Sequence, residues 1–131
     1  TNTEDWPNVV KYYEQHLKDN SDDYKSVFLL MEAYSHTGEF AKMLKTSADM
    51  IDLFPSQPQM YYYNGLANNQ LQQYKKALDV LDEGYSYVVD NPQLEINFLI
   101  QLGEAANGLG DQKKKENYFI KAEKLLKQFK K

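Results

Sequence analysis

Cysteine and arginine are both absent from this chain. Without cysteine there can be no disulfide and no thiolate chemistry. The cysteine content therefore does not distinguish an oxidising compartment from a reducing one. All 15 basic residues are lysines, so the planar guanidinium forks that commonly bind phosphate are missing. No run of about 18 apolar residues occurs either, so we expect no membrane insertion of this segment.

Positive charge is scarce in the first part of the chain. The formal net charge is −4, and residues 1–57 carry ten acidic side chains against five lysines. Residues 92–131 carry five acidic side chains against eight lysines, which suit the carboxyl end of a solvated helix. Because an acidic surface repels phosphate at long range, we expect no nucleic-acid partner.

Residues for catalysis or metal binding are also few. The two histidines, His16 and His36, fall on separate predicted helices, whereas a zinc site needs about four ligands. Glu32 lies four residues before His36, so both could bind one metal ion on the same helix face, but two ligands are too few for a metal site. Capping and solvated helix faces explain the acidic pairs, and no phosphate loop or nucleophile–base arrangement occurs. We therefore expect no cofactor, no metal and no enzymatic activity.

What the chain does contain is a near-repeat. The residues that open the second predicted helix of each hairpin are 34 residues apart from Trp6 to Phe40 and again from Phe40 to Tyr74, and 38 apart from Tyr74 to Gln112. A period of this length is typical of stacked helical hairpins, each of which buries its apolar face against its neighbours. The sequence thus predicts an all-α solenoid of about seven helices.

Hydrophobic spacing and turn residues place these helices. We expect them at residues 5–19, from the 20–23 turn to about 36, and at 40–54, 59–71, 74–88, 94–109 and 112–130. Asp5 is expected to cap the first helix, and Gly38 to end the second in the left-handed conformation. Leu44, Ser47, Ala48 and Ile51 are expected to be buried. The break at 71–73 lacks glycine, so packing should hold it more than turn chemistry.

The expected domain is single and spans 1–131. It divides into the second half of a preceding repeat (1–23) and three repeats at 24–57, 58–91 and 92–131. The connection before the third repeat is four residues longer, which equals about one helical turn. We expect a lengthened helix near 85–89 or 94–98, not a flexible loop.

The pattern within the units resembles the tetratricopeptide repeat, a helix–turn–helix unit of 34 residues. The middle unit carries the resemblance with Tyr61, Gly65, Tyr74, Ala77, Leu81 and Gly84. The third unit carries it with Leu99, Leu102, Gly103, Ala106, Gly110, Phe119 and Ala122, and the first with Val27, Leu30, Tyr34, Gly38, Phe40 and Pro55. The resemblance covers nearly the whole chain as three and a half units.

Three residues depart from the family's pattern. Met31 and Met43 stand where small residues usually let two helices approach closely, so the first hairpin should be wider, with flexible methionine side chains filling the gap. Lys115 takes a small-residue place in the third unit, so that helix pair should splay or shift by one residue.

The resemblance implies a right-handed superhelix whose concave side, lined by the first helix of each unit, holds peptides from partner proteins. Carried over to this sequence, the groove residues are Phe28, Glu32, Ser35, Tyr62, Leu66, Asn69, Gln70, Asn97, Ile100, Glu104 and Asn107. Some of these would instead be core residues if the helices were rotated by one residue. One subclass of the family binds a carboxylate with cations in this groove; no cation stands at the matching places here, and Glu32 would repel that ligand.

The expected function is a non-enzymatic scaffold that binds a peptide or partner protein, within a larger bacterial tetratricopeptide-repeat protein. The alternative is self-association through exposed terminal helix faces, including a homodimer through Val9, Val10, Tyr13 and Leu17 of the first helix. Composition favours the periplasm or cell envelope over the cytoplasm.

Overall fold

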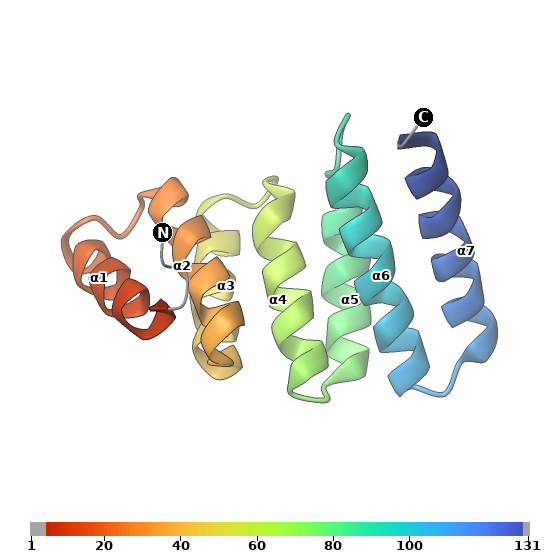
Figure 1. Cartoon of the computed structure of the whole chain (residues 1–131), viewed down its shortest axis with the longest axis horizontal. Coiled ribbons are helices and arrows are strands. Elements are labelled where there is room, and N and C mark those ends of the chain that lie inside the picture. The colour runs from red at the N-terminus through yellow and green to blue at the C-terminus, as the bar shows by residue number, and fades with distance from the viewer. Residues whose placement is uncertain (1–4, 130–131) are drawn as a thin grey trace.

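The computed structural model describes residues 5–129, which form seven α-helices joined by short turns and contain no strand. The helices are α1 (Trp6–Asp19), α2 (Tyr24–Thr37), α3 (Phe40–Leu53), α4 (Pro58–Gln70), α5 (Tyr74–Tyr85), α6 (Pro92–Gly108) and α7 (Gln112–Phe129). They follow one another along the long axis, with α1 and α7 at opposite ends (Figure 1). The predicted all-α solenoid is confirmed.

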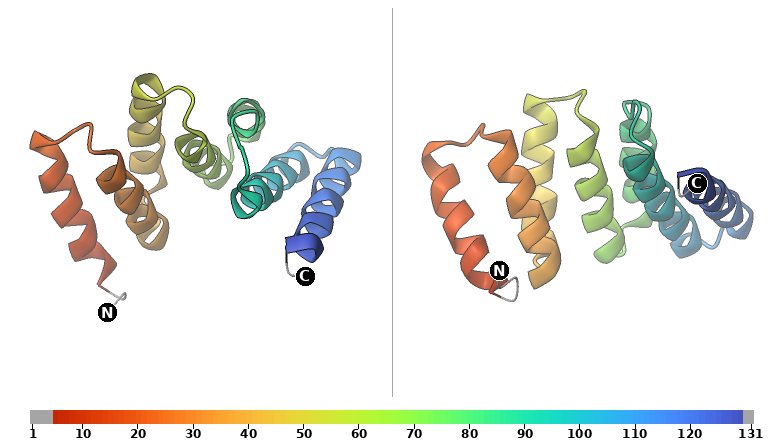
Figure 2. Two further views of the ribbon diagram at one scale, coloured as in Figure 1. Left: turned by 90° about the horizontal axis from the view of Figure 1, so that it is seen from above. Right: turned by 45° about the horizontal axis from the view of Figure 1, so that its top comes forward.

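Alternate helices form two layers. In the view from above, α3 and α5 lie behind the row that contains α2, α4 and α6 (Figure 2). Each helix packs mainly against its neighbours in sequence, and α4 also contacts α2 and α6 directly. The first helices of the hairpins therefore share one continuous face.

Three equivalent turns close the hairpins with the same backbone conformation. Gly38, Gln72 and Gly110 all have positive φ, at 76°, 60° and 79°. In each turn the backbone amide of the next residue donates a hydrogen bond to the carbonyl oxygen five residues before it. The bond from the Gln73 amide to the Asn68 oxygen is 2.8 Å long. This is the Schellman pattern that caps helix carbonyls. The expectation that the turn without glycine depends mainly on packing is wrong, because Gln72 adopts the left-handed conformation and makes the same hydrogen bonds.

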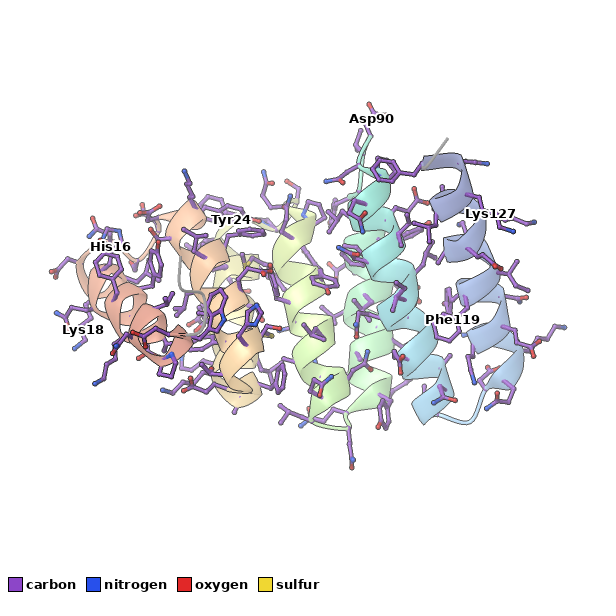
Figure 3. The ribbon with its side chains drawn as sticks, viewed as in Figure 1. His16, Lys18, Tyr24, Asp90, Phe119 and Lys127 are labelled. Atoms are coloured by element: carbon purple, nitrogen blue, oxygen red, sulfur yellow. The ribbon has the colours of Figure 1, made fainter. Side chains whose placement is uncertain are left out.

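Close approach of paired helices depends on glycines inside them. A Cβ atom built on Gly65 of α4 would lie 2.2 Å from a side-chain carbon of Leu81 in α5. A Cβ atom on Gly103 of α6 would lie 2.3 Å from the ring of Phe119, which sits between α6 and α7 (Figure 3). Each glycine thus leaves room for a large residue of the partner helix.

The departures from the repeat pattern have different outcomes. Met31 and Met43 are both fully buried, and the backbones of α2 and α3 approach each other at fewer places than those of α4 and α5. The methionines therefore fill a wider interface, as expected. The expected splay at Lys115 is wrong: its side chain is half-buried, and α6 and α7 pack closely along their length.

Two local expectations are also corrected. The Asp5 carboxylate makes no capping bond to the backbone of α1; it accepts a hydrogen bond from the Asn8 side chain at 2.8 Å. Ala48 is exposed, because the inward face of α3 is formed by Met43, Ser47 and Met50 instead.

The extra residues of the last unit lie in a helix. α6 has 17 residues and α4 has 13. Both helices begin at a proline, and Gly103 stands four places further into its helix than Gly65 does. The added turn is therefore at the amino end of α6, where it extends the shared face of α2, α4 and α6.

The apolar stripe of α1 is covered. Val10 is 4% exposed, and Val9, Tyr13 and Leu17 are half-buried against a core cluster that includes residues of α2 and α3. Only Tyr12, at 64% exposure, presents a large aromatic surface to water on this helix. The stripe expected to face solvent is instead part of the core.

Candidate groove on the face of α2, α4 and α6

Two hollows lie in line along the face shared by α2, α4 and α6. The first has a volume of about 290 Å³ and is lined by Phe28, Glu32, Gln59, Tyr62, Tyr63, Asn91, Gln93, Leu94 and Asn97. The second has a volume of about 390 Å³ and is lined by Asn69, Gln70, Gln72, Tyr74, Gln101 and Glu104.

Helical spacing explains why these side chains meet. Phe28 and Glu32 are four residues apart on α2, and Gln93 and Asn97 are four apart on α6. Residues at this spacing lie one above the other on one helix face. The added turn of α6 contributes Gln93 and Leu94, so the longer helix deepens the first hollow.

Aromatic rings form the apolar part of the first hollow. Tyr63 is 3% exposed, and its ring lies 5.7 Å from that of Phe28 and 5.2 Å from that of Tyr62, at interplanar angles of 71° and 67°. Tyr62 also packs at 6.0 Å against the buried ring of Phe98 in α6. Edge-to-face contacts of this kind are favourable, and they hold the rings in place.

Glu32 is the only side chain with a formal charge among the described residues that line the first hollow. The Tyr63 hydroxyl donates a hydrogen bond to its Oε2 atom. Burial and this carboxylate raise the pKa of Tyr63 far above its usual value. Burial, and to a lesser degree Glu32, also raise the pKa of Tyr62. Both phenols therefore stay neutral at physiological pH.

Amides dominate the second hollow, and one of them has a structural role. The Asn69 side-chain nitrogen donates to the backbone oxygen of Gln101 at 3.0 Å and to its side-chain Oε1 at 2.9 Å. Asn69 is only 7% exposed. It therefore ties α4 to α6 while it lines the second hollow, and its side-chain nitrogen is engaged within the protein.

The other predicted groove residues fall at several depths. Phe28, Glu32, Tyr62 and Asn97 line the first hollow, and Gln70 and Glu104 line the second. Ile100 is 40% exposed, whereas Leu66 is half-buried against the core. Ser35 and Asn107 are exposed and line neither hollow.

Sequence reasoning missed several lining residues, namely Gln59, Tyr63, Asn91, Gln93, Leu94, Gln72, Tyr74 and Gln101. Gln59, Gln93 and Leu94 lie one helical turn before predicted residues, and extending the spacing toward the start of each helix would have found them. Tyr63 could not be found in this way, because it is 3% exposed and its place in the hollow follows from the packing of its ring against Phe28 and Tyr62.

The histidines have local roles in the described part of the chain. The His36 ring stacks on Trp6, with ring centroids 4.0 Å apart, and His16 Nε2 lies 2.9 Å from the Asp23 carboxylate. Across residues 5–129, no three side chains of the metal-binding types come together in a ligand set. Within the same residues, no helix has both the length and the apolar character needed to cross a bilayer.

Comparisons with known proteins agree on the architecture. Residues 2–84 match the family model described as anaphase-promoting complex, cyclosome, subunit 3. No curated protein matches the sequence.

Two solved structures of MamA are similar in fold. The one described as MamA MSR-1 C2 has a TM-score of 0.73 at 14% identity, covering 91% of this chain and 66% of that one, so the present chain spans about two thirds of its length. The second, a crystal structure of MamA, has a TM-score of 0.61 at 17% identity, covering 95% of this chain and 90% of that one. Identities this low make the likeness one of fold alone.

The family match covers well over half of the chain, and the hairpins, turn glycines and helix-crossing glycines are those of tetratricopeptide-type repeats. The chain therefore belongs to the helical-repeat family described as anaphase-promoting complex, cyclosome, subunit 3, and its repeats are of the tetratricopeptide type.

Proposed function

We propose that this chain is a non-enzymatic scaffold that holds an extended segment of a partner protein along the face of α2, α4 and α6. The observation that carries the proposal is the alignment of two hollows on that face, one aromatic and one rich in amides. Rigid aromatic side chains supply much of the contact energy in protein interfaces, and amides bind a peptide backbone without preference for charge.

The chemistry of the groove supports binding over catalysis. Its perturbed groups are tyrosines whose pKa values are raised, which makes them poorer proton donors at neutral pH. Among the described lining residues, no serine or histidine stands beside these groups to act as a nucleophile or base.

A peptide-array screen followed by titration of the best peptide tests the proposal. Ile100→Ala removes an apolar side chain that is 40% exposed on α6, about one helical turn from both Asn97 and Glu104. Ile120→Ala is the control, because Ile120 is 50% exposed on α7, outside the face of α2, α4 and α6. We expect Ile100→Ala to weaken binding about tenfold, which corresponds to about 1.4 kcal/mol, and Ile120→Ala to leave it unchanged.

Tyr62→Ala should weaken binding further, since it removes an aromatic wall of the first hollow. Circular dichroism of each variant must first show that the helices are retained. Equal affinities for the wild type, Ile100→Ala and Tyr62→Ala would place the binding surface elsewhere and remove the groove from consideration.

Self-association is the second candidate, now favoured by α7 and not by α1. Leu126 and Phe129, three residues apart on one side of α7, are 38% and 53% exposed, whereas the stripe of α1 packs against the core. Exposed apolar surface of this kind often marks an interface. Light scattering over a range of concentrations should then show a dimer that Phe129→Ser dissociates; a monomer at every concentration contradicts this candidate.

A further inference from the structure

We infer that the first hollow is a cation site, which accepts a lysine or arginine side chain of the segment bound in the groove. This inference rests on the proposed function and deepens it, because it names the chemistry of the residue that the partner must supply. It depends on three aromatic rings, one carboxylate and the size of the hollow.

The rings provide the surfaces that attract a cation. Tyr63 forms the floor of the hollow at 3% exposure, and Phe28 and Tyr62 form walls at steep angles to it. The face of an aromatic ring carries negative potential and attracts an ammonium or guanidinium group within about 6 Å of its centroid. Since both phenols remain protonated, the rings stay neutral, and the charge of the site comes from the carboxylate.

Glu32 supplies that charge. The Tyr63 hydroxyl is bonded to its Oε2 atom, and a carboxylate has further acceptor positions, including both lone pairs of Oε1. No lysine is among the described residues that line the hollow, so none there can neutralise Glu32. Glu32 is half-buried, and partial removal of water strengthens its attraction for a cation.

The size of the hollow suits a side chain better than a free small molecule. Its volume of about 290 Å³ is at the lower limit of pockets that hold drug-sized ligands, which is roughly 300 Å³. Gln93 and Asn97 stand at its α6 side, where the Gln93 side-chain nitrogen donates to Asn97 Oδ1 at 3.0 Å. The Gln93 side-chain oxygen and the Asn97 side-chain nitrogen can then bond to the backbone of the same segment. The excess of acidic residues in 1–57 also steers cationic segments toward this end of the molecule.

The experiment uses the whole chain and two kinds of probe. The first probe is lysine capped as its N-acetyl methylamide, compared with the same compound acetylated at Nζ, each titrated into isotope-labelled protein and followed by NMR. We expect the charged compound to shift the resonances of Phe28, Tyr62 and Tyr63, and the neutral one to leave them in place. The arginine compound, compared with its neutral citrulline analogue, shows whether both cations are accepted.

The second probe is a groove-binding peptide from the array, with its lysine replaced by acetyl-lysine. Glu32→Gln keeps an acceptor for the Tyr63 hydroxyl and removes the charge, and Glu116→Gln on exposed α7 makes the same change in net charge. We expect about tenfold weaker binding for Glu32→Gln and for the acetylated peptide, and no change for Glu116→Gln. Tyr62→Leu should also weaken binding, with Tyr62→Phe restoring it.

The outcomes separate the two proposals. Peptides that bind equally with lysine and with acetyl-lysine overturn the cation site and leave the scaffold function standing. Local shifts by capped lysine, with no peptide bound by the groove, support the cation site and contradict the scaffold function. Absence of shifts at Phe28, Tyr62 and Tyr63, or equal effects of Glu32→Gln and Glu116→Gln, overturns the cation site.

Discussion

At Gly65, the lack of a side chain decides how close α4 and α5 can lie. Leu81 fills the space that a Cβ atom would need, and Leu81 is fully buried, so it has nowhere to move. The same relation holds between Gly84 and Tyr61, and between Gly103 and Phe119. Single residues thus set the spacing of the hairpins.

Gly65→Ala is therefore expected to destabilise the protein, although alanine is the better helix former by about 1 kcal/mol. Forcing a methyl group into a filled core costs about 1–3 kcal/mol, so we expect a net decrease of up to about 2 kcal/mol in the free energy of unfolding. Urea denaturation measures it. The double variant with Leu81→Ala should lose less than the sum of the single losses, because the clash is gone. An increase in stability in Gly65→Ala would contradict the packing described here.

The backbone conformation of Gln72 can also be tested by substitution. It occupies the left-handed position that glycine holds at Gly38 and Gly110, and this conformation costs a residue with a Cβ atom roughly 1–2 kcal/mol. Gln72→Gly should therefore raise the free energy of unfolding by up to about 1 kcal/mol, after the greater chain entropy of unfolded glycine is subtracted.

The reverse substitution is the control for Gln72. At Gly38 an added Cβ atom would meet nothing within 4 Å, so Gly38→Gln tests the backbone alone and should lower stability by a similar amount. Thermal and urea unfolding of both variants provide the measurement. If Gln72→Gly were destabilising, side-chain contacts of Gln72 would matter more than its backbone strain.

Between helices, three tyrosines that are buried or half-buried link neighbouring helices through hydrogen bonds to glutamates. The Tyr34 hydroxyl of α2 donates to Glu14 of α1 at 2.6 Å, and that of Tyr63 in α4 donates to Glu32 in α2. A third such bond joins Tyr85 of α5 to Glu95 of α6. Each lets a large ring fill the interface while its polar tip is satisfied at the edge, which explains part of the high tyrosine content.

Removing one of these hydroxyls tests the links. Tyr63→Phe keeps the ring and deletes a hydrogen bond to a carboxylate, so we expect a loss of about 1.5 kcal/mol in the free energy of unfolding. Tyr12→Phe is the matched control, since Tyr12 is 64% exposed, and its change should be near zero. Equal stabilities of the two variants in urea denaturation would show that the Tyr63 link contributes nothing.

Across the whole molecule, Tyr24 and the three tyrosines bonded to glutamates predict sensitivity to alkaline pH. Burial raises the pKa of Tyr24 to about 12, and burial together with a neighbouring carboxylate raises the pKa values of Tyr34, Tyr63 and Tyr85 further. In the unfolded chain these phenols lose their protons near pH 10. The stability they contribute is therefore complete below about pH 10 and is lost as the pH rises toward their folded-state pKa values.

Urea denaturation between pH 8 and pH 11 should show this decline in the free energy of unfolding. Each such phenol contributes at most about 1.4 kcal/mol per pH unit. Absorbance at 295 nm should show these tyrosines titrating only when the chain unfolds. The stability of Tyr34→Phe should fall less steeply with pH than that of the wild type. The stability of Tyr12→Phe should fall as steeply as that of the wild type. A stability that stays constant up to pH 11 would rule out the effect.

Much of this architecture could be predicted from local patterns in the sequence. The 34-residue spacing, the apolar stripes and the residues at Gly38 and Gly110 depend only on helical periodicity and turn chemistry, which act over a few neighbouring residues. Helix number, helix order and the small-residue crossings at Gly65 and Gly103 could therefore be predicted from the sequence, as could the burial of Ser47.

Helix rotation and the partners of polar side chains required the tertiary structure. Asn69 looks like a free groove amide in the sequence, yet it bonds to Gln101 some thirty residues away, and Tyr63 forms the floor of the hollow beside Glu32. Ala48 and the stripe of α1 were assigned to the wrong environments for a related reason. Which face of a helix is covered depends on the crossing angles of all its neighbours, and no local pattern of residues contains that information.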